Sequence, residues 1–289
     1  MKYNKLGSTD IDVSRIGLGG EWLNGKSQEE VKAIIETAIE GGINFFDFLF
    51  NHTDYVTKIG KAINEFRDRM IIQTHIGTTE KEGKANRDRN MKRNKKFFHN
   101  TLNHYKTEYV DIINIQFVKE KEFQDVKGDN GLLGLANQLK NEGKARFIGL
   151  STHNASIAIN AIKEELVDTI MFPINMINHN LEHRAELLSL IVNSGIGLIG
   201  IKPFAGGKLL QNNRTVYIAK YQTGGISERK KIPKLINLHQ CVKYCLDQKG
   251  ISTIIPGVHK EEELAAILQY YKISRNNKDY KTILPELLS

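Results

Sequence analysis

A carboxylate and an imidazole fall within short apolar segments of the sequence, where polar side chains need partners. Asp47 follows Phe45 and Phe46, and His75 lies near the end of the apolar segment that begins at Ile71. Burying either group costs free energy unless another polar group meets it. We expect Asp47 and His75 to meet, because a carboxylate beside an imidazole suits proton transfer.

Short apolar segments alternate with amphipathic helical segments along the chain. Strands are predicted at 15–20, 44–48, 70–76, 111–118, 145–151, 169–174, 197–203 and 252–256. They are apolar on both faces, as strands buried in a parallel sheet are. Eight strand–helix units favour an α/β fold of the (β/α)8 TIM-barrel type, in one domain over residues 1–289, with a short β-hairpin at its start. No Gly-x-Gly-x-x-Gly fingerprint follows the first strand, which argues against a Rossmann domain.

In such a barrel the active site lies at the carboxyl ends of the strands. Side chains predicted at those ends include the catalytic candidates Asp47, His52, His75 and Gln116. The glycines of the segment 202–207 allow a ligand to approach the backbone closely, and Gly257 leads into a helix whose first amides suit a phosphate. The sequence therefore predicts a phosphorylated cofactor near the candidates Lys202, Gly206, Gly207, Gly257 and Lys260.

Other features exclude several classes of protein. No apolar segment is long enough to span a membrane, and the start of the chain has no signal-peptide core, so we expect a cytoplasmic protein without a membrane partner. Cys241 and Cys245 are expected to be reduced core thiols. His179 and His183 lack a third ligand, so no metal site is predicted.

The chain carries a formal net charge of +8, and most of it comes from one stretch. The helix predicted at 87–105 has an apolar face, with basic residues mostly on the opposite face. No nucleic-acid motif accompanies them, so we interpret them as a solvated surface and expect no nucleic-acid partner. The basic residues of this stretch are Lys84, Arg87, Arg89, Lys92, Arg93, Lys95, Lys96 and Lys106, against the single acid Asp88.

Six strings in register resemble the aldo-keto reductase family over residues 2–268. They are Tyr3–Gly7 with Val13–Gly19, Gly42–Asp47, Thr107–Asp111, Glu142–Gly149, Lys202–Gly207 and Ile255–Gly257. The segments 151–153 and 171–175 look most like a branch whose members often carry a C-terminal ferredoxin-like extension. The cysteines of that extension are absent from this sequence.

The resemblance implies a barrel that binds NADP(H) and reduces carbonyls with an Asp-Tyr-Lys-His tetrad. Asp47 matches the aspartate, whereas the tyrosine position holds His52, the lysine position His75 and the histidine position Gln116. A histidine at 52 can donate a proton, and an imidazolium at 75 can replace the charge of the lysine. Gln116 can still donate a hydrogen bond to a carbonyl oxygen.

The resemblance also implies roles at the cofactor. Ser151 matches the serine near the nicotinamide carboxamide, and Lys260 matches the basic residue that meets the 2′-phosphate of NADP(H). Thr152 stands where asparagine is usual, and Ile201 stands where an aromatic residue stacks on the nicotinamide.

The sequence leaves three alternative functions open, each with a small-molecule ligand. The first is a divergent NADP(H)-linked oxidoreductase acting on a carbonyl or an activated double bond. The second is a non-redox isomerase or lyase that uses Asp47, His52 and His75 as acid and base. The third is a catalytically inactive binding or regulatory protein. The insertion at 211–234 is long enough to fold over the mouth of the barrel.

Overall fold

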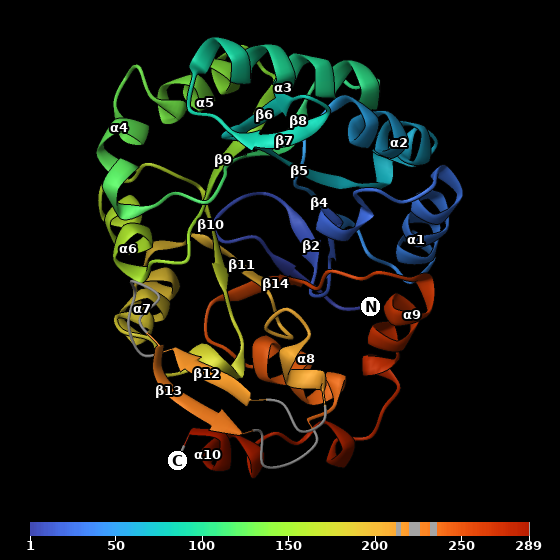
Figure 1. Ribbon diagram of the computed structural model, residues 1–289, viewed down its shortest axis with the longest axis vertical. Helices are drawn as coiled ribbons and strands as arrows, with labels where there is room; N and C mark the ends of the chain where they lie inside the picture. Colours follow the sequence, from blue (N-terminus) through green and yellow to red (C-terminus); the bar gives the residue numbers. More distant parts are fainter. Residues whose placement is uncertain (212–214, 220–225, 232–235, 289) are drawn as a thin grey trace.

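Eight parallel strands form a ring at the centre of this computed structural model (Figure 1). The structure describes residues 1–211, 215–219, 226–231 and 236–288, the two short middle ranges by their backbone alone. Bridges from Ile16 to Ile254 and from Gly19 to Gly257 join the first strand to the last and close the ring. The predicted (β/α)8 barrel is therefore confirmed. Its strands are β3 (Leu18–Gly19), β4 (Phe45–Phe48), β5 (Ile71–Ile76), β8 (Val110–Ile115), β9 (Ala145–Ser151), β10 (Thr169–Pro173), β11 (Gly197–Ile201) and β14 (Ile251–Ile255).

Helices surround the ring of strands (Figure 1). The first begins as its sequence indicates, because Ser27 and Glu30 form a capping box in which each side chain accepts the other's backbone N–H. The helices are α1 (Gln28–Glu40), α2 (Thr53–Ile63), α3 (Met91–Tyr105), α4 (Phe123–Lys127), α5 (Leu132–Asn141), α6 (Ala155–Lys163), α7 (Arg184–Ser194), α8 (Leu238–Leu246), α9 (Glu261–Leu268) and α10 (Ile283–Leu288).

Alternation along the strands divides the apolar residues into two cores. Side chains such as Ile72 and Ile113 point outward and pack against the helices. Inside the ring, Ile112 packs with Leu6 and Val13 of the N-terminal hairpin, whose strands are β1 (Tyr3–Lys5) and β2 (Asp12–Ser14). The predicted hairpin is present, and it packs against the apolar interior of the barrel.

One helix prediction is wrong at its start. Arg87, the first residue expected in the helix over 87–105, is instead the last residue of a hairpin of β6 (Thr78–Lys81) and β7 (Lys84–Arg87). The turn uses positive φ angles at Glu82 and Gly83. Helix α3 begins only at Met91, because the Asn90 side chain accepts a hydrogen bond from the backbone N–H of Arg93.

The long insertion contains a second hairpin, of β12 (Thr215–Ala219) and β13 (Ile226–Lys231). Figure 1 shows these strands near α8, to one side of the ring, so this part of the insertion does not lie over its centre. The remainder of the predicted lid, at 212–214, 220–225 and 232–235, lies outside the described residues. Among the described helices, none has the length and apolar character needed to cross a membrane.

Candidate active site

A buried acid–imidazole pair lies inside the barrel. Asp47 on β4 and His75 on β5 point inward, and the distance from Asp47 Oδ1 to His75 Nε2 is 2.7 Å. The two residues are only 4% and 2% exposed. Gln73 on β5 also donates from Nε2 to Asp47 Oδ1, at 2.6 Å. The structure thus brings together the two residues that the sequence analysis placed in one site.

An amide on the next strand completes this group. Asn114 on β8 places Nδ2 3.1 Å from His75 Nδ1. An ionised Asp47 can only accept hydrogen bonds, so the proton of a neutral His75 lies on Nε2, and Nδ1 accepts from Asn114. The sequence analysis did not select Gln73 or Asn114. They precede His75 and Gln116 by two residues and point to the same side of their strands, which was the available signal.

His52 has a local structural role. It is the N-cap of α2, where its Nδ1 accepts from the backbone N–H of Tyr55 at 3.4 Å. Its Nε2 lies 3.0 Å from Asn24 Oδ1, to which it donates. Burial lowers the pKa of His52. Both nitrogens are therefore engaged, and within the described residues no hydrogen bond links His52 to Asp47 or His75.

Tyr55, the tyrosine nearest to the expected tetrad position, does not replace it. Its hydroxyl donates to the Gly20 carbonyl oxygen at 2.9 Å, and the residue is 2% exposed. Burial raises the pKa of Tyr55 well above its usual value. This phenol is held as a structural hydrogen-bond donor.

Gln116 is the predicted catalytic residue with an unengaged polar end. It continues the ladder beyond β8, where its N–H donates to the Ile76 carbonyl oxygen at 2.8 Å. It lies two residues beyond Asn114 and faces the same side, nearer the carboxyl end of the barrel. Its Oε1 is buried and has no partner in the described part of the chain. A half-buried amide of this kind can bind a polar ligand.

Ser151 and Thr152 at the end of β9 differ in whether their hydroxyl groups are free to bind a ligand. The Ser151 Oγ accepts from the backbone N–H of Phe117 at 2.7 Å, which leaves its own proton for another acceptor. Thr152 donates to the Val118 carbonyl oxygen at 2.8 Å and accepts from the Asn154 N–H at 3.1 Å. Thr152 is fully buried, so it orders this loop and offers no group to a ligand.

The loop after β11 provides an accessible backbone. Lys202 is exposed there, and Gly206 and Gly207 have φ values of +67° and +79°, which favour glycine. A Cβ at Gly206 would meet no atom within 4 Å. A ligand can therefore approach this backbone, as the sequence analysis expected.

The loop after β14 carries an aromatic pair and a cluster of charges. Trp22 lies so close to Gly257 that a Cβ there would be 2.5 Å from the indole, and the Trp22 ring is 4.2 Å from that of His259. Lys260 is exposed at the N-cap of α9, beside the acidic first turn Glu261–Glu263. The helix N-terminus suits an anion, whereas these three carboxylates oppose one.

A histidine near the mouth titrates unusually. His153 packs its ring against Phe117 with centroids 4.8 Å apart. Burial, aided by the positive charge of Lys202, lowers the pKa of His153 to about 4.

This depressed pKa gives the stability a defined pH dependence. Between pH 6.5 and about 4 the unfolded chain protonates His153 and the folded chain does not. The contribution of His153 to the free energy of unfolding therefore falls as the pH is lowered through that window. Between pH 7 and pH 4.5, the free energy of unfolding measured with urea should fall by less in His153→Phe than in wild type. Equal losses would contradict this assignment.

Half of the basic residues in the charged stretch are ion-paired. Arg87 and Arg89 meet Glu122, Arg93 meets Asp88, and Lys95 meets Glu142. The Arg93 guanidinium is the main cause that lowers the pKa of Asp88 to about 2. These pairs fit the interpretation of α3 as a solvated face.

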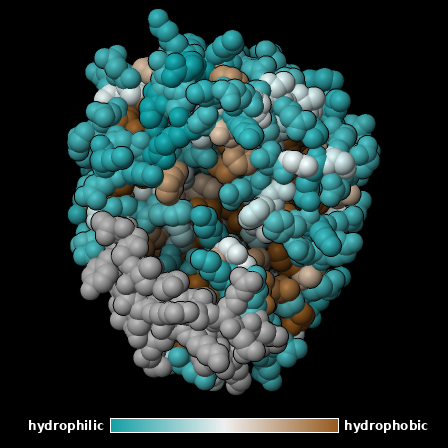
Figure 2. All heavy atoms as spheres, viewed as in Figure 1, coloured by the Kyte–Doolittle hydropathy of each residue, from teal (hydrophilic) through white to brown (hydrophobic). Residues whose placement is uncertain are grey.

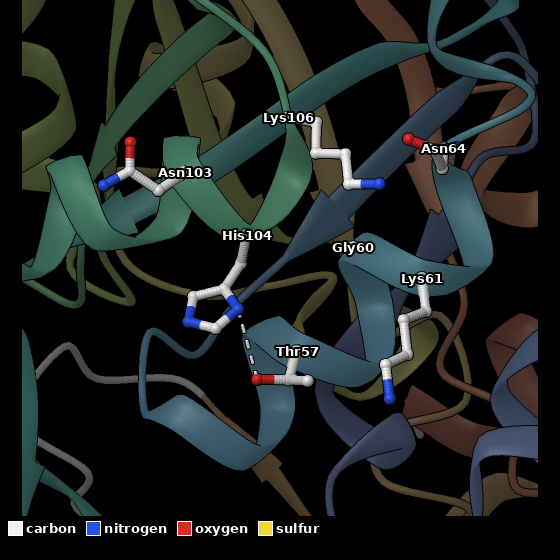
Figure 3. Close-up of a pocket in the computed structure, with 7 residues that line it drawn as sticks. All are labelled: Thr57, Gly60, Lys61, Asn64, Asn103, His104 and Lys106. Atoms are coloured by element: carbon white, nitrogen blue, oxygen red, sulfur yellow. Dashed lines mark hydrogen bonds between the residues drawn. The ribbon is translucent and has the colours of Figure 1, made fainter.

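A cavity of about 380 Å³ opens between α2 and α3 (Figure 3). It lies near the C-terminal ends of both helices, where cationic side chains complement the helix dipole. His104 Nδ1 is 3.2 Å from Thr57 Oγ1 across it. Its lining residues are Thr57, Gly60, Lys61, Asn64, Asn103, His104 and Lys106, none of which follows a barrel strand.

The residues weighed as metal ligands have other partners. His179 Nδ1 lies 2.7 Å from the Tyr244 hydroxyl, and His183 precedes α7 with φ +59°. Within the described residues no group of three or more His, Cys, Asp and Glu side chains is placed to hold a metal. Cys241 and Cys245 are free and buried, and burial raises the pKa of Cys241 to about 12.

The space-filling view shows apolar atoms recessed at the centre of one face, within a largely hydrophilic surround (Figure 2). The barrel and the polar residues at its strand ends can be compared with those of known proteins. The model of the aldo/keto reductase family matches residues 15–284. The chain belongs to this family.

Curated relatives and solved structures agree. The chain is 25% identical over 283 residues to the uncharacterized oxidoreductase YqkF of Bacillus subtilis, covering 93% of this chain and 90% of that protein. It is 26% identical to the NADH-specific methylglyoxal reductase of Escherichia coli, covering 93% of this chain and 89% of that protein. The holo form of aldo-keto reductase AKR11C1 from Bacillus halodurans superposes with a TM-score of 0.79 at 21% identity. The superposition covers 99% of this chain and 96% of that one. This structural likeness supports the fold.

Proposed function

We propose that this protein is a nicotinamide-dependent oxidoreductase that reduces a small carbonyl compound in a rebuilt tetrad. The observation that carries the proposal is the free amide of Gln116, which lies on the inward side above the Asp47–His75 pair. Membership of the aldo/keto reductase family supports the reaction class.

The residues present fit a nicotinamide dinucleotide. Gln116 Oε1 is a buried acceptor without a protein partner, and Ser151 keeps a hydroxyl proton to donate. The open backbone at Gly206 can approach a pyrophosphate, and Lys260 lies at a helix N-terminus. When bound, the dinucleotide supplies the hydride that reduces the carbonyl carbon.

The chain's own residues orient the substrate and stabilise charge. Gln116 Nε2 donates a hydrogen bond to the carbonyl oxygen as negative charge develops on it. Asp47 accepts a hydrogen bond from His75 beneath it, and this pair orders the base of the site at the position where the family has its lysine. No protein side chain in the described site replaces the tyrosine as proton donor, so the alkoxide takes its proton from water.

The charges near Lys260 bear on the choice of dinucleotide. Three glutamates in the first turn of α9 outweigh the one lysine, which disfavours the additional 2′-phosphate of NADPH. We therefore expect NADH to bind at least as tightly as NADPH, and Glu262→Lys to shift the preference towards NADPH. Fluorescence titration and thermal unfolding measure this, since a ligand at 100 times its Kd adds about 2.7 kcal/mol.

Two results would contradict this proposal. Absence of binding of both dinucleotides would remove the cofactor, and with it the oxidoreductase function. A strong NADPH preference in wild type that Glu262→Lys leaves unchanged would show that α9 does not contact the 2′-phosphate. Lys249→Ala, an exposed lysine on another loop, is a matched control that should alter neither affinity.

A second candidate is a dinucleotide-binding protein without turnover. It is favoured by the engagement of both nitrogens of His52 and of His75, which leaves neither of these two imidazoles free to exchange a proton with a ligand. Saturable binding of a dinucleotide, with no reduction of any member of a panel of small aldehydes and 2-oxoaldehydes, would support this candidate over the first.

A further inference from the structure

The cavity between α2 and α3 lies at the end of the barrel opposite its mouth. Helices of such a barrel begin near the carboxyl ends of the strands and run back, so their last turns lie near the amino ends. The two helices meet closely here, because a Cβ on Gly60 of α2 would clash with the His104 carbonyl oxygen of α3. This glycine lets both last turns line one cavity of about 380 Å³, which is large enough for a small molecule (Figure 3).

Two lysines line this cavity, and neither forms an ion pair with a described residue. Lys61 belongs to the last turn of α2, and Lys106 directly follows α3. Other lysines of the same helices, Lys58 and Lys95, do form ion pairs. Among the described residues the cavity lining contains no Asp or Glu. Each helix end carries the equivalent of about half a negative charge, so two lysines leave the cavity positive.

Lys106 has a backbone conformation that glycine usually provides at the end of a helix. Its φ and ψ are 50° and 45°. The N–H of Lys106 donates to the Asn103 carbonyl oxygen, and the N–H of Thr107 donates to that of Leu102, as in a Schellman motif. An L residue is strained at such a φ. The strained residue brings an ammonium group to the cavity, where Figure 3 shows its side chain extending toward Asn64 of α2.

The remaining lining groups can bond to hydroxyls or other neutral oxygens. Thr57 donates its own proton to the Thr53 carbonyl oxygen at 2.7 Å, so its Oγ1 accepts from His104 Nδ1. Nε2 of the neutral His104 ring is then an acceptor. Figure 3 shows no other hydrogen bond among the lining side chains, which leaves the amides of Asn64 and Asn103 unengaged within this group.

We propose that this cavity binds a phosphate group, free or carried by a small polar metabolite, with the ammonium groups of Lys61 and Lys106 on the phosphate oxygens. Lysine is a common phosphate ligand, and the nearly double negative charge of a phosphate matches two unpaired ammonium groups. The amides of Asn64 and Asn103 and the His104 ring meet the remainder of the ligand. The site lies away from the barrel mouth, so it stands or falls independently of the proposed reduction.

The test is an NMR titration of the ¹⁵N-labelled protein with sodium phosphate, glycerol phosphate, glycerol and sodium chloride in separate series. We expect the backbone amide signals of Gly60 and Lys106 to shift saturably with both phosphates, and not with glycerol or chloride. Lys61→Gln should weaken the Kd for phosphate about tenfold or more, the equivalent of one charge-assisted hydrogen bond. A tighter Kd for glycerol phosphate would identify an ester as the ligand, and equal values would identify free phosphate.

Lys106→Gly is the most informative variant, because glycine adopts the positive φ without strain. It should leave the melting temperature without phosphate unchanged or higher, while the Kd for phosphate weakens about tenfold or more. Lys92→Gln removes an exposed lysine about 20 Å away along α3 and should bind phosphate as wild type does. The proposal is overturned if the two amide signals do not saturate, if chloride shifts them equally, or if Lys61→Gln and Lys106→Gly keep the wild-type Kd.

Discussion

Replacing Asp47 by alanine is expected to lower the free energy of unfolding by about 3–5 kcal/mol. Asp47 Oδ1 accepts from both His75 and Gln73 in the barrel interior, and its removal leaves two buried donors without an acceptor. A loss of this size is a large fraction of the total stability of a typical domain. Urea unfolding with linear extrapolation measures it.

Two further variants distinguish the stability contributed by the buried Asp47–His75 pair from the general effect of removing a carboxylate. Asp47→Asn retains an acceptor oxygen and should cost less than Asp47→Ala. Asp12→Ala removes an aspartate whose ion pair with Lys5 is largely exposed, and should change stability by about 0–1 kcal/mol. If Asp47→Ala and Asp12→Ala cost the same, the pair inside the barrel does not contribute as described.

Replacing Gln116 by alanine is expected to slow hydride transfer by about 10²–10³-fold, the usual effect of removing one donor to a developing oxyanion. Because the Gln116 Oε1 has no hydrogen-bond partner among the described residues, loss of this side chain should change the melting temperature little. Single-turnover measurement of dinucleotide oxidation in the presence of a 2-oxoaldehyde gives the rate.

His52→Ala is the informative comparison for Gln116→Ala. Loss of this N-cap should cost about 0.5–2 kcal/mol of stability while the rate of hydride transfer changes little. The reverse pattern, an unchanged rate in Gln116→Ala and a large loss in His52→Ala, would transfer the catalytic role to His52.

The barrel could be predicted because its pattern is local. Strands that are apolar on both faces alternate with capped amphipathic helices, and the Ser27–Glu30 box marks one helix start directly. The hairpin at 78–87 was missed because its strands are polar and show no apolar alternation. Its signal was the turn at Glu82 and Gly83, where positive φ is required.

The candidate site could be predicted only in part. The meeting of Asp47 and His75 followed from their positions at the ends of neighbouring strands. The engagement of His52 could not be predicted, since its partner Asn24 lies 28 residues away in a different loop. The contact between Asn114 and His75 depends on the register of β5 and β8, which the sequence does not specify.

The most direct measurement follows deuterium from the dinucleotide to the product. Wild-type protein is mixed with NADH or NADPH that carries deuterium at C4 of the nicotinamide, together with a 2-oxoaldehyde, and the alcohol is analysed by mass spectrometry. We expect deuterium at the carbinol carbon and a slower transfer in Gln116→Ala. A protein that binds the labelled dinucleotide tightly but never transfers deuterium would contradict the oxidoreductase function of this site.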